Sequence, residues 1–191
     1  LQRGVQFLVH RGPHLLQLGL VAFLQAAQAL LERGARVRIA CRNPEKAFTL
    51  KPLANLGQLQ VQRCDIANER SLESAIAGSD AVVNLVGAFG GDLHKLMGEA
   101  PGIMARLARA AGAQAFVHVS AIGADDGSNI DYASAKAMGE REVADKFPDA
   151  TIIRPSVIFG KDDNFLNLFG GMIEMLPVLP VSLALMTLCH G

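Results

Sequence analysis

The sequence has 191 residues, of which 50% are hydrophobic and 19% are charged. A chain of this length and apolar content can bury a core without disulfides or metals, which excludes an intrinsically disordered protein. Eighteen basic and eighteen acidic side chains give a net charge of zero, without a polybasic run, which argues against a non-specific nucleic-acid-binding protein and against attachment to an anionic membrane surface.

Short apolar runs alternate with helical patterns along the chain. The strands that this alternation predicts span residues 5–9, 35–42, 59–64, 81–86, 115–120 and 151–154. The predicted helices span residues 14–33, 68–76, 93–111 and 132–147. Asn68 is a suitable N-cap for the second helix. Pro101 and Gly102 should kink the third helix, because proline has no N–H to donate.

The order of these elements predicts the fold class. Strands that alternate with helices of this length pair in parallel through right-handed crossovers. Apolar strand centres fit a sheet that is covered on both faces. We therefore expect an α/β fold with a Rossmann-type, doubly wound parallel sheet. Ligands bind such sheets outside the carboxyl ends of the strands, which are followed here by Arg42, Asp65, Gly87, Ser120 and Pro155.

Cysteine spacing and hydropathy indicate which sites and which cellular location to expect. Cys41, Cys64 and Cys189 form no Cys-x-x-Cys or Cys/His cluster, so we expect neither a metal site nor a disulfide framework. This predicts a reducing compartment and a cytoplasmic location. The apolar stretches 14–31 and 175–189 are interrupted by glutamines and prolines respectively, so no transmembrane span is expected.

The strongest chemical signal is the run Tyr132-Ala-Ser-Ala-Lys136. Residues four apart share one face of a helix, so the Lys136 ammonium would lie beside the Tyr132 hydroxyl. The positive charge would lower the pKa of the tyrosine and make it an acid or base near neutral pH. Ser120 ends the preceding strand and is placed to orient a carbonyl or hydroxyl group of a substrate. The alternative is that Tyr132 and Lys136 only decorate a surface helix.

These residues, with the turn from Asn84 to Gly87, resemble the short-chain dehydrogenase/reductase superfamily. The runs RVRIACRNPEK, DAVVNLVGAF, HVSAIGAD, YASAKAMGE and TIIRPSVIFGKDDNFLN are similar to its extended, atypical branch of NAD-dependent epimerase/dehydratase-like proteins. Within that branch they most resemble the family of NAD(P)H-binding accessory subunits of respiratory complex I and their bacterial relatives. The resemblance covers about residues 26–180.

The resemblance implies a domain organisation. An NAD(P)-binding Rossmann domain would span residues 1–180, with an atypical part at 1–27 and an aberrant tail at 181–191. We expect no second domain, and a C-terminal substrate region that is missing or truncated. If the chain assembles with complex I, its location would be peripheral on the inner membrane, on the cytoplasmic or matrix face.

The resemblance also implies contacts at the adenosine end of a dinucleotide. Arg42 follows the second strand, where an acidic residue would bind the ribose 2′-hydroxyl of NAD. An arginine there suits a 2′-phosphate, so NADP(H) is favoured over NAD(H). Asp65 and Ile66 match the adenine contact after the third strand. The alternatives are a solvated charge for Arg42 and a helix cap for Asp65.

At the nicotinamide end, Asn84, Gly87 and Ala88 match the turn beside the ribose. Pro155 and Val157 match the segment that covers the nicotinamide. Tyr132 and Lys136 would also contact the cofactor, and Lys136 would hold the ribose. Alternatively, Gly87 is an ordinary loop glycine.

The first βα turn departs from the superfamily pattern. It carries Gly12 followed by Pro13, where the superfamily has a glycine-rich loop that lets the backbone approach the pyrophosphate. Gly12 is the candidate phosphate contact. A helix that begins beside His10, Arg11 and His14 would still favour anions.

The sequence is compatible with three functions. The first is a non-catalytic subunit that binds NAD(P)(H) and assembles with complex I. The second is an NAD(P)-dependent reductase, epimerase or dehydratase that uses Ser120, Tyr132 and Lys136 as its catalytic residues. The third is a truncated or frame-altered product without a competent site.

Overall fold

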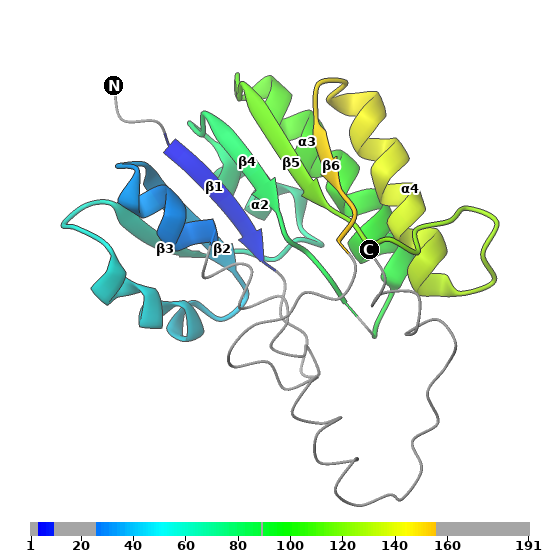
Figure 1. Ribbon diagram of the computed structural model, residues 1–191, viewed down its shortest axis with the longest axis horizontal. Coiled ribbons are helices and arrows are strands. Elements are labelled where there is room, and N and C mark those ends of the chain that lie inside the picture. The colour runs from blue at the N-terminus through cyan, green and yellow to red at the C-terminus, as the bar shows by residue number, and fades with distance from the viewer. Residues whose placement is uncertain (1–3, 10–25, 89, 156–191) are drawn as a thin grey trace, which may run out of the picture.

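The computed structural model describes residues 4–9, 26–88 and 90–155 of the chain. Within these residues, six parallel strands form one sheet in the order β3-β2-β1-β4-β5-β6 (Figure 1). The strands are β1 (Gly4–Val9), β2 (Arg36–Cys41), β3 (Leu59–Arg63), β4 (Ala81–Asn84), β5 (Ala115–Val119) and β6 (Thr151–Ile153). The sheet confirms the predicted α/β, doubly wound class.

Helices cover both faces of this sheet. They are the 3₁₀-helix η1 (Pro44–Leu53), α2 (Glu69–Ile76), the π-helix η2 (His94–Glu99), α3 (Ala100–Ala110) and α4 (Asp131–Lys146), and residues 26–32 are also helical. Side chains of α2, α3 and α4 share one buried cluster with strands β4 and β5. Residues 26–32 and η1 contribute to a second cluster, which includes Val37 and Ile39 of β2.

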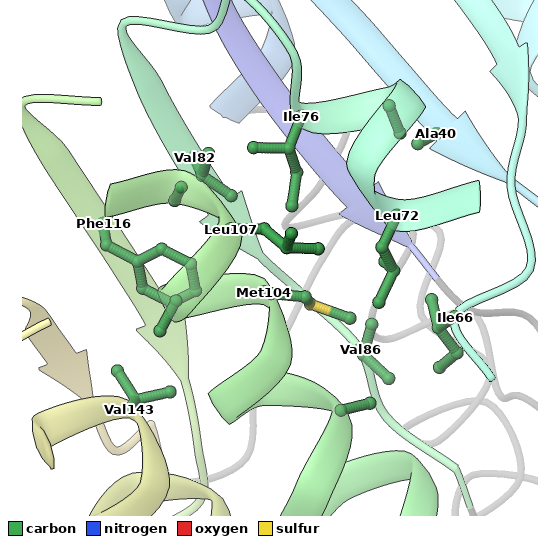
Figure 2. Close-up of a cluster of buried hydrophobic side chains, with 14 of the residues drawn as sticks. Ala40, Ile66, Leu72, Ile76, Val82, Val86, Met104, Leu107, Phe116 and Val143 are labelled. Atoms are coloured by element: carbon green, nitrogen blue, oxygen red, sulfur yellow. The ribbon is translucent and has the colours of Figure 1, made fainter. Parts of the chain in front are cut away.

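The larger cluster sits between α2, α3 and the middle of the sheet (Figure 2). Apolar residues at helical spacing on α2 and α3 meet apolar residues at alternate positions of the strands. The labelled side chains at its centre are Leu72, Ile76, Val82, Met104, Leu107 and Phe116. Each is at most 8% exposed, so this layer fixes α2 and α3 on the sheet.

Several strands end one or two residues earlier than predicted, and for β4 a polar side chain explains the difference. Strand β4 was expected to reach Val86 but ends at Asn84. The Asn84 side-chain oxygen accepts a hydrogen bond from the Val86 N–H at 3.0 Å, so the chain turns away from the sheet there. Strands β5 and β6 also end one residue before the predicted limits, at Val119 and Ile153.

The predicted helix over 93–111 is divided between Glu99 and Ala100, just before Pro101. Directly before this proline the chain forms η2, in which the Ala100 N–H donates to the Lys95 oxygen five residues back. The Met97 carbonyl would pair with the N–H of residue 101 in an α-helix, and proline has none. The wider turn accommodates the proline, and the helix continues as α3.

Some expectations lie outside the described residues. Gly12, Val157, residues 10–25 of the first turn and helix, and the segment 181–191 belong to this group. Among the described residues, no helix is long and apolar enough to cross a membrane. That same part of the chain holds no group of three or more side chains suited to a metal ion.

Candidate functional site

The carboxyl ends of all the strands lie along one edge of the sheet because every strand pair is parallel. Arg42, Asp65, Ser120 and Arg154 follow β2, β3, β5 and β6 there within two residues, and Gly87 follows β4 within three. Chain order reverses between β1 and β4, which makes that place the topological switch point. Ligands of doubly wound sheets bind at this point.

At one end of this edge, Arg42 and Asp65 face each other. The Arg42 Nη2 lies 3.8 Å from the Asp65 Oδ1, and the two side chains are 42% and 56% exposed. The Asp65 Oδ1 also accepts a hydrogen bond from the Ala67 N–H at 3.1 Å, while Asn68 caps α2. An exposed ion pair of this length contributes little to stability, so Arg42 is accessible to a competing anion.

Ile66 differs from the other residues expected at the adenosine end. It is 3% exposed and belongs to the large buried cluster with Leu72 of α2. Its side chain therefore supports the core, and a ligand at this edge would reach its backbone more readily than its side chain.

In the turn after β4, Asn84 is fully buried between two partners. Its side-chain oxygen accepts from the Val86 N–H, and its Nδ2 lies 2.9 Å from the Nδ1 of His118. At Gly87, no atom of the described residues lies within 4 Å of the place that a Cβ would take. Ala88 is buried, and its N–H donates to the Met97 Sδ at 3.3 Å. Of the three predicted residues in this turn, Gly87 thus leaves the most room for a ligand.

Lys136 is buried, at 2% exposure, and its ammonium bridges two strand ends. The Nζ donates to the Val86 oxygen at 3.1 Å and to the Val119 oxygen at 3.0 Å. Burial lowers the pKa of Lys136 to about 8, and the Glu140 carboxylate opposes that shift. The predicted helix that carries Lys136 is confirmed as α4, and its lysine reaches the expected edge.

Tyr132 does not show the lowered pKa that its spacing from Lys136 predicts. The side chain is half-buried, and burial raises the pKa of its hydroxyl above the ordinary value. The Lys136 ammonium is directed at the two backbone carbonyls instead. Both observations oppose the activation of Tyr132 by Lys136 that the sequence predicts.

Ser120 lies where expected, directly after β5, and is 4% exposed. Its N–H donates to the Ile153 oxygen at 2.8 Å, which continues the β5–β6 pairing beyond the strand. Its hydroxyl makes no hydrogen bond of normal geometry within the described part of the chain. It is nevertheless close enough to Glu140 to lower the pKa of that carboxyl. A buried hydroxyl that makes no hydrogen bond of normal geometry is an available group for a ligand.

The sequence did not single out three polar residues that complete this site: His118, Glu140 and Arg154. His118 is 1% exposed, and burial lowers the pKa of its imidazole to about 4, aided by the Lys136 charge. The ring is therefore neutral. Because its Nδ1 accepts from Asn84, the proton is assigned to Nε2, which has no partner among the described residues.

Glu140 pairs with Arg154. Glu140 also follows Lys136 by one helical turn, and this spacing of a lysine and a glutamate could have been recognised in the sequence.

Away from this edge lies a cavity of about 170 Å³ at the amino ends of β2 and β3. Its lining includes Arg36, Arg38 and Ser79. Arg38 is engaged there with the Gln60 side chain and the carbonyls of Ala75 and Ala77, near the end of α2. This cavity is at the opposite end of the strands from Lys136 and is not part of the candidate site.

Comparisons with known proteins agree with this geometry. Residues 24–166 match a family described as NAD(P)H-binding. The chain is 37% identical over 142 residues to the mitochondrial NADH dehydrogenase (ubiquinone) 1 alpha subcomplex subunit 9 of Mus musculus, covering 72% of this chain and 38% of that protein. It is 30% identical over 186 residues to the protein of the same name from Dictyostelium discoideum, covering 90% and 52%.

Among solved structures, the fold is similar to the NADPH-dependent quinone oxidoreductase of Escherichia coli in complex with NADPH. The TM-score is 0.57 at 21% identity, covering 78% of this chain and 48% of that one. The chain spans 38% and 52% of the lengths of the mouse and Dictyostelium relatives.

Proposed function

Because the chain belongs to the NAD(P)H-binding family, we propose that its dinucleotide lies along the carboxyl edge of the sheet, from Arg42 to Pro155. The observation that carries the proposal is the strand order β3-β2-β1-β4-β5-β6, whose switch point lies between the two ends of that edge. In such sheets the dinucleotide crosses the switch point, with its two halves on opposite sides. Residues that suit the two halves follow β2 and β3 on one side, and β4 and β5 on the other.

At the adenosine end, we propose that Arg42 selects NADP(H) over NAD(H). Its guanidinium is 42% exposed and bound only weakly to Asp65, so it can exchange that carboxylate for a 2′-phosphate. Asp65 would then face the adenine, with the backbone of Ile66 beside it. The exposed, charged side chains at this end of the edge suit the 2′-phosphate of NADP(H).

At the nicotinamide end, we propose that Asn84, Gly87 and Ala88 shape the turn beside the ribose. Lys136 would hold the ribose hydroxyls, with Tyr132 next to it on α4. Its third N–H is not used by the carbonyls of Val86 and Val119, so a donor remains for a ligand. Gly12, Pro155 and Val157 complete the proposed contacts as expectations from the sequence.

We favour a binding subunit over an enzyme. Burial raises the pKa of Tyr132, and the Lys136 ammonium donates to backbone carbonyls; both observations work against acid–base chemistry by this pair near neutral pH. The names of the mouse and Dictyostelium relatives suggest assembly with respiratory complex I. Such a subunit would lie peripherally on the inner membrane, on the matrix or cytoplasmic face.

One observation favours the enzymatic alternative. The Ser120 hydroxyl is buried and makes no hydrogen bond of normal geometry in the described residues, although it lies near Glu140, so it can turn to orient a substrate group. The dinucleotide supplies hydride-transfer chemistry when bound. Ser120 would orient the substrate, and Tyr132 would hold the proton on its Oη. Replacement of Tyr132 by Phe should then abolish any measured reductase or epimerase activity, and unchanged activity would exclude this role.

Calorimetric titration of the purified protein with NADPH and NADH tests the proposal. We expect NADPH to bind more tightly. The Arg42→Ala variant should lose about 10- to 100-fold in NADPH affinity and nothing in NADH affinity, because a charged hydrogen bond contributes about 1.5–3 kcal/mol. Arg109→Ala is the matched control, since Arg109 is exposed in the last turn of α3, which leads to the amino end of β5 and not to this edge. If neither nucleotide binds, the proposal is wrong, and the protein is the third alternative, a product without a competent site.

Co-purification tests the assembly. A tagged form of the protein should be recovered with the subunits of respiratory complex I from solubilised membranes. Recovery of the tagged protein from the soluble fraction alone would contradict the proposed partner while leaving the dinucleotide site intact.

A further inference from the structure

Glu140 is a buried carboxylate on α4 that pairs with Arg154 and follows Lys136 on the same helix. It lies on α4 one helical turn after Lys136, and its side chain is 8% exposed. The Nε of Arg154 donates to both carboxylate oxygens, at 2.8 Å and 3.1 Å, and its Nη2 bonds Oε2 as well. Buried carboxylates require such partners, because an unpaired charge in the interior is strongly unfavourable.

Lys136 depends on the same carboxylate. Its ammonium donates to two neutral acceptors, the oxygens of Val86 and Val119, which do not balance its charge. Glu140 is the carboxylate whose charge acts on Lys136 in the described structure. The other titratable groups near this helix do not compensate Lys136: His118 on β5 is neutral, and Arg154 after β6 is a cation.

Tyr132 on α4 is uncharged at neutral pH because burial raises the pKa of its hydroxyl. His94 of η2 faces the exposed Ser134 hydroxyl at 3.5 Å. Neither group supplies a negative charge to Lys136. Glu140 therefore serves two cations at once.

We propose that Glu140 is a positioning residue of the dinucleotide site, which keeps Lys136 cationic and fixes the end of β6 through Arg154. The inference rests on the proposed function. Lys136 ties the ends of β4 and β5, and Glu140 with Arg154 adds the end of β6. One helix thus holds three neighbouring strand ends in place, and the group formed by Lys136, Glu140 and Arg154 carries one net positive charge toward an anionic cofactor.

The charge of Lys136 can be read directly, without cofactor, from the pH titration of its side-chain ¹³Cε resonance by NMR. The chain has six lysines, and the Lys136→Arg variant assigns the resonance. In Glu140→Gln the midpoint of the Lys136 titration should fall by about one unit or more, because an opposite charge at this range shifts a pKa by 1–3 units. The upper pH limit of NADPH binding should fall with it.

The Arg154→Gln variant separates charge from structure. It removes the same ion pair as Glu140→Gln, but it leaves Glu140 free to act on Lys136 and removes a like charge. The midpoint of the Lys136 titration should therefore rise. If Glu140 had only a structural role, the midpoint of the Lys136 titration would shift in the same direction in both variants. Glu142→Gln, on the same helix, is the control and should leave the midpoint unchanged.

If Glu140→Gln does not fold, Glu140→Asp provides the measurement, since it keeps the charge and should keep the midpoint near that of the natural protein. An unchanged midpoint in Glu140→Gln, or shifts of the same sign in Glu140→Gln and Arg154→Gln, overturns the inference. Opposite shifts in a protein that binds no dinucleotide would overturn the proposed function and, with it, the assignment of Glu140 to that site.

Discussion

Gly139 is the position where one added methyl group should do most damage. It lies in the middle of α4, where the helix meets η2. A Cβ at this position would overlap the Met97 carbonyl oxygen and lie 3.5 Å from the His118 Nε2. The carbonyl belongs to the backbone of the π-helix, so it cannot rotate away as a side chain would. The two helices must separate, or η2 must deform.

The magnitude of the Gly139→Ala effect follows from two opposing contributions. Alanine is favoured over glycine in a helix interior by about 1 kcal/mol. Overpacking in a closely packed core costs about 1–3 kcal/mol, and backbone contacts lie at the upper end. We expect a net loss of about 1–2 kcal/mol in the free energy of unfolding. For a protein of this size that corresponds to a decrease of about 2–8 °C in Tm.

Thermal and urea unfolding, followed by circular dichroism, measure this effect. Gly98→Ala is the matched control, because a Cβ there meets the flexible Met138 side chain, with its Sδ at 2.7 Å. It should cost less than Gly139→Ala. A Gly139→Ala protein as stable as the natural one, or more stable, would refute the close approach of α4 to η2, since helix propensity alone predicts stabilisation.

Three further predictions concern polar side chains with specific hydrogen-bond partners. His118 has a folded-state pKa of about 4 against 6.5 in the unfolded chain, so the unfolded state binds more protons between these values. Stability should therefore decrease by up to about 3 kcal/mol as pH falls from 6.5 to 4, and urea unfolding of His118→Gln should show a smaller decrease. Asn84→Ala should cost about 2–3 kcal/mol in urea unfolding, because the Val86 N–H and His118 each lose a partner; a cost below 0.5 kcal/mol would contradict this. Arg38→Met should lower Tm more than Arg36→Met, because only Arg38 binds Gln60, Ala75 and Ala77; equal effects would contradict this.

The fold was predictable from the sequence because its strands follow simple rules. Val37 and Ile39 alternate with Arg36 and Arg38, and the structure buries the first pair in the core. Such alternation identifies a strand and its inner face without tertiary information. The limits of the strands were less accurate, because a single side chain such as Asn84 can end the backbone pairing.

The site was only partly predictable. Arg42, Ser120 and Lys136 could be placed at one edge because the carboxyl ends of parallel strands coincide. The burial of Lys136 and Glu140 could not be predicted, since both residue types usually lie on the surface. Their environment depends on Arg154, 14 residues after Glu140, and on where β6 ends. The pKa of Tyr132 was predicted in the wrong direction for the same reason: burial and the direction of the Lys136 ammonium depend on tertiary packing.

The extra residue in the wide turn of η2 sets the rotation of everything that follows it in α3. Each residue of an α-helix turns the chain by about 100°. If the same residues followed regular α-helical spacing, with none removed, α3 would rotate by about that angle against the sheet. Arg106 would then take the direction of Leu107, which is 8% exposed and packs in the core. Deleting one residue within η2 would instead remove the extra residue and keep the faces of α3, so this turn should tolerate a one-residue deletion better than the middle of α3 does.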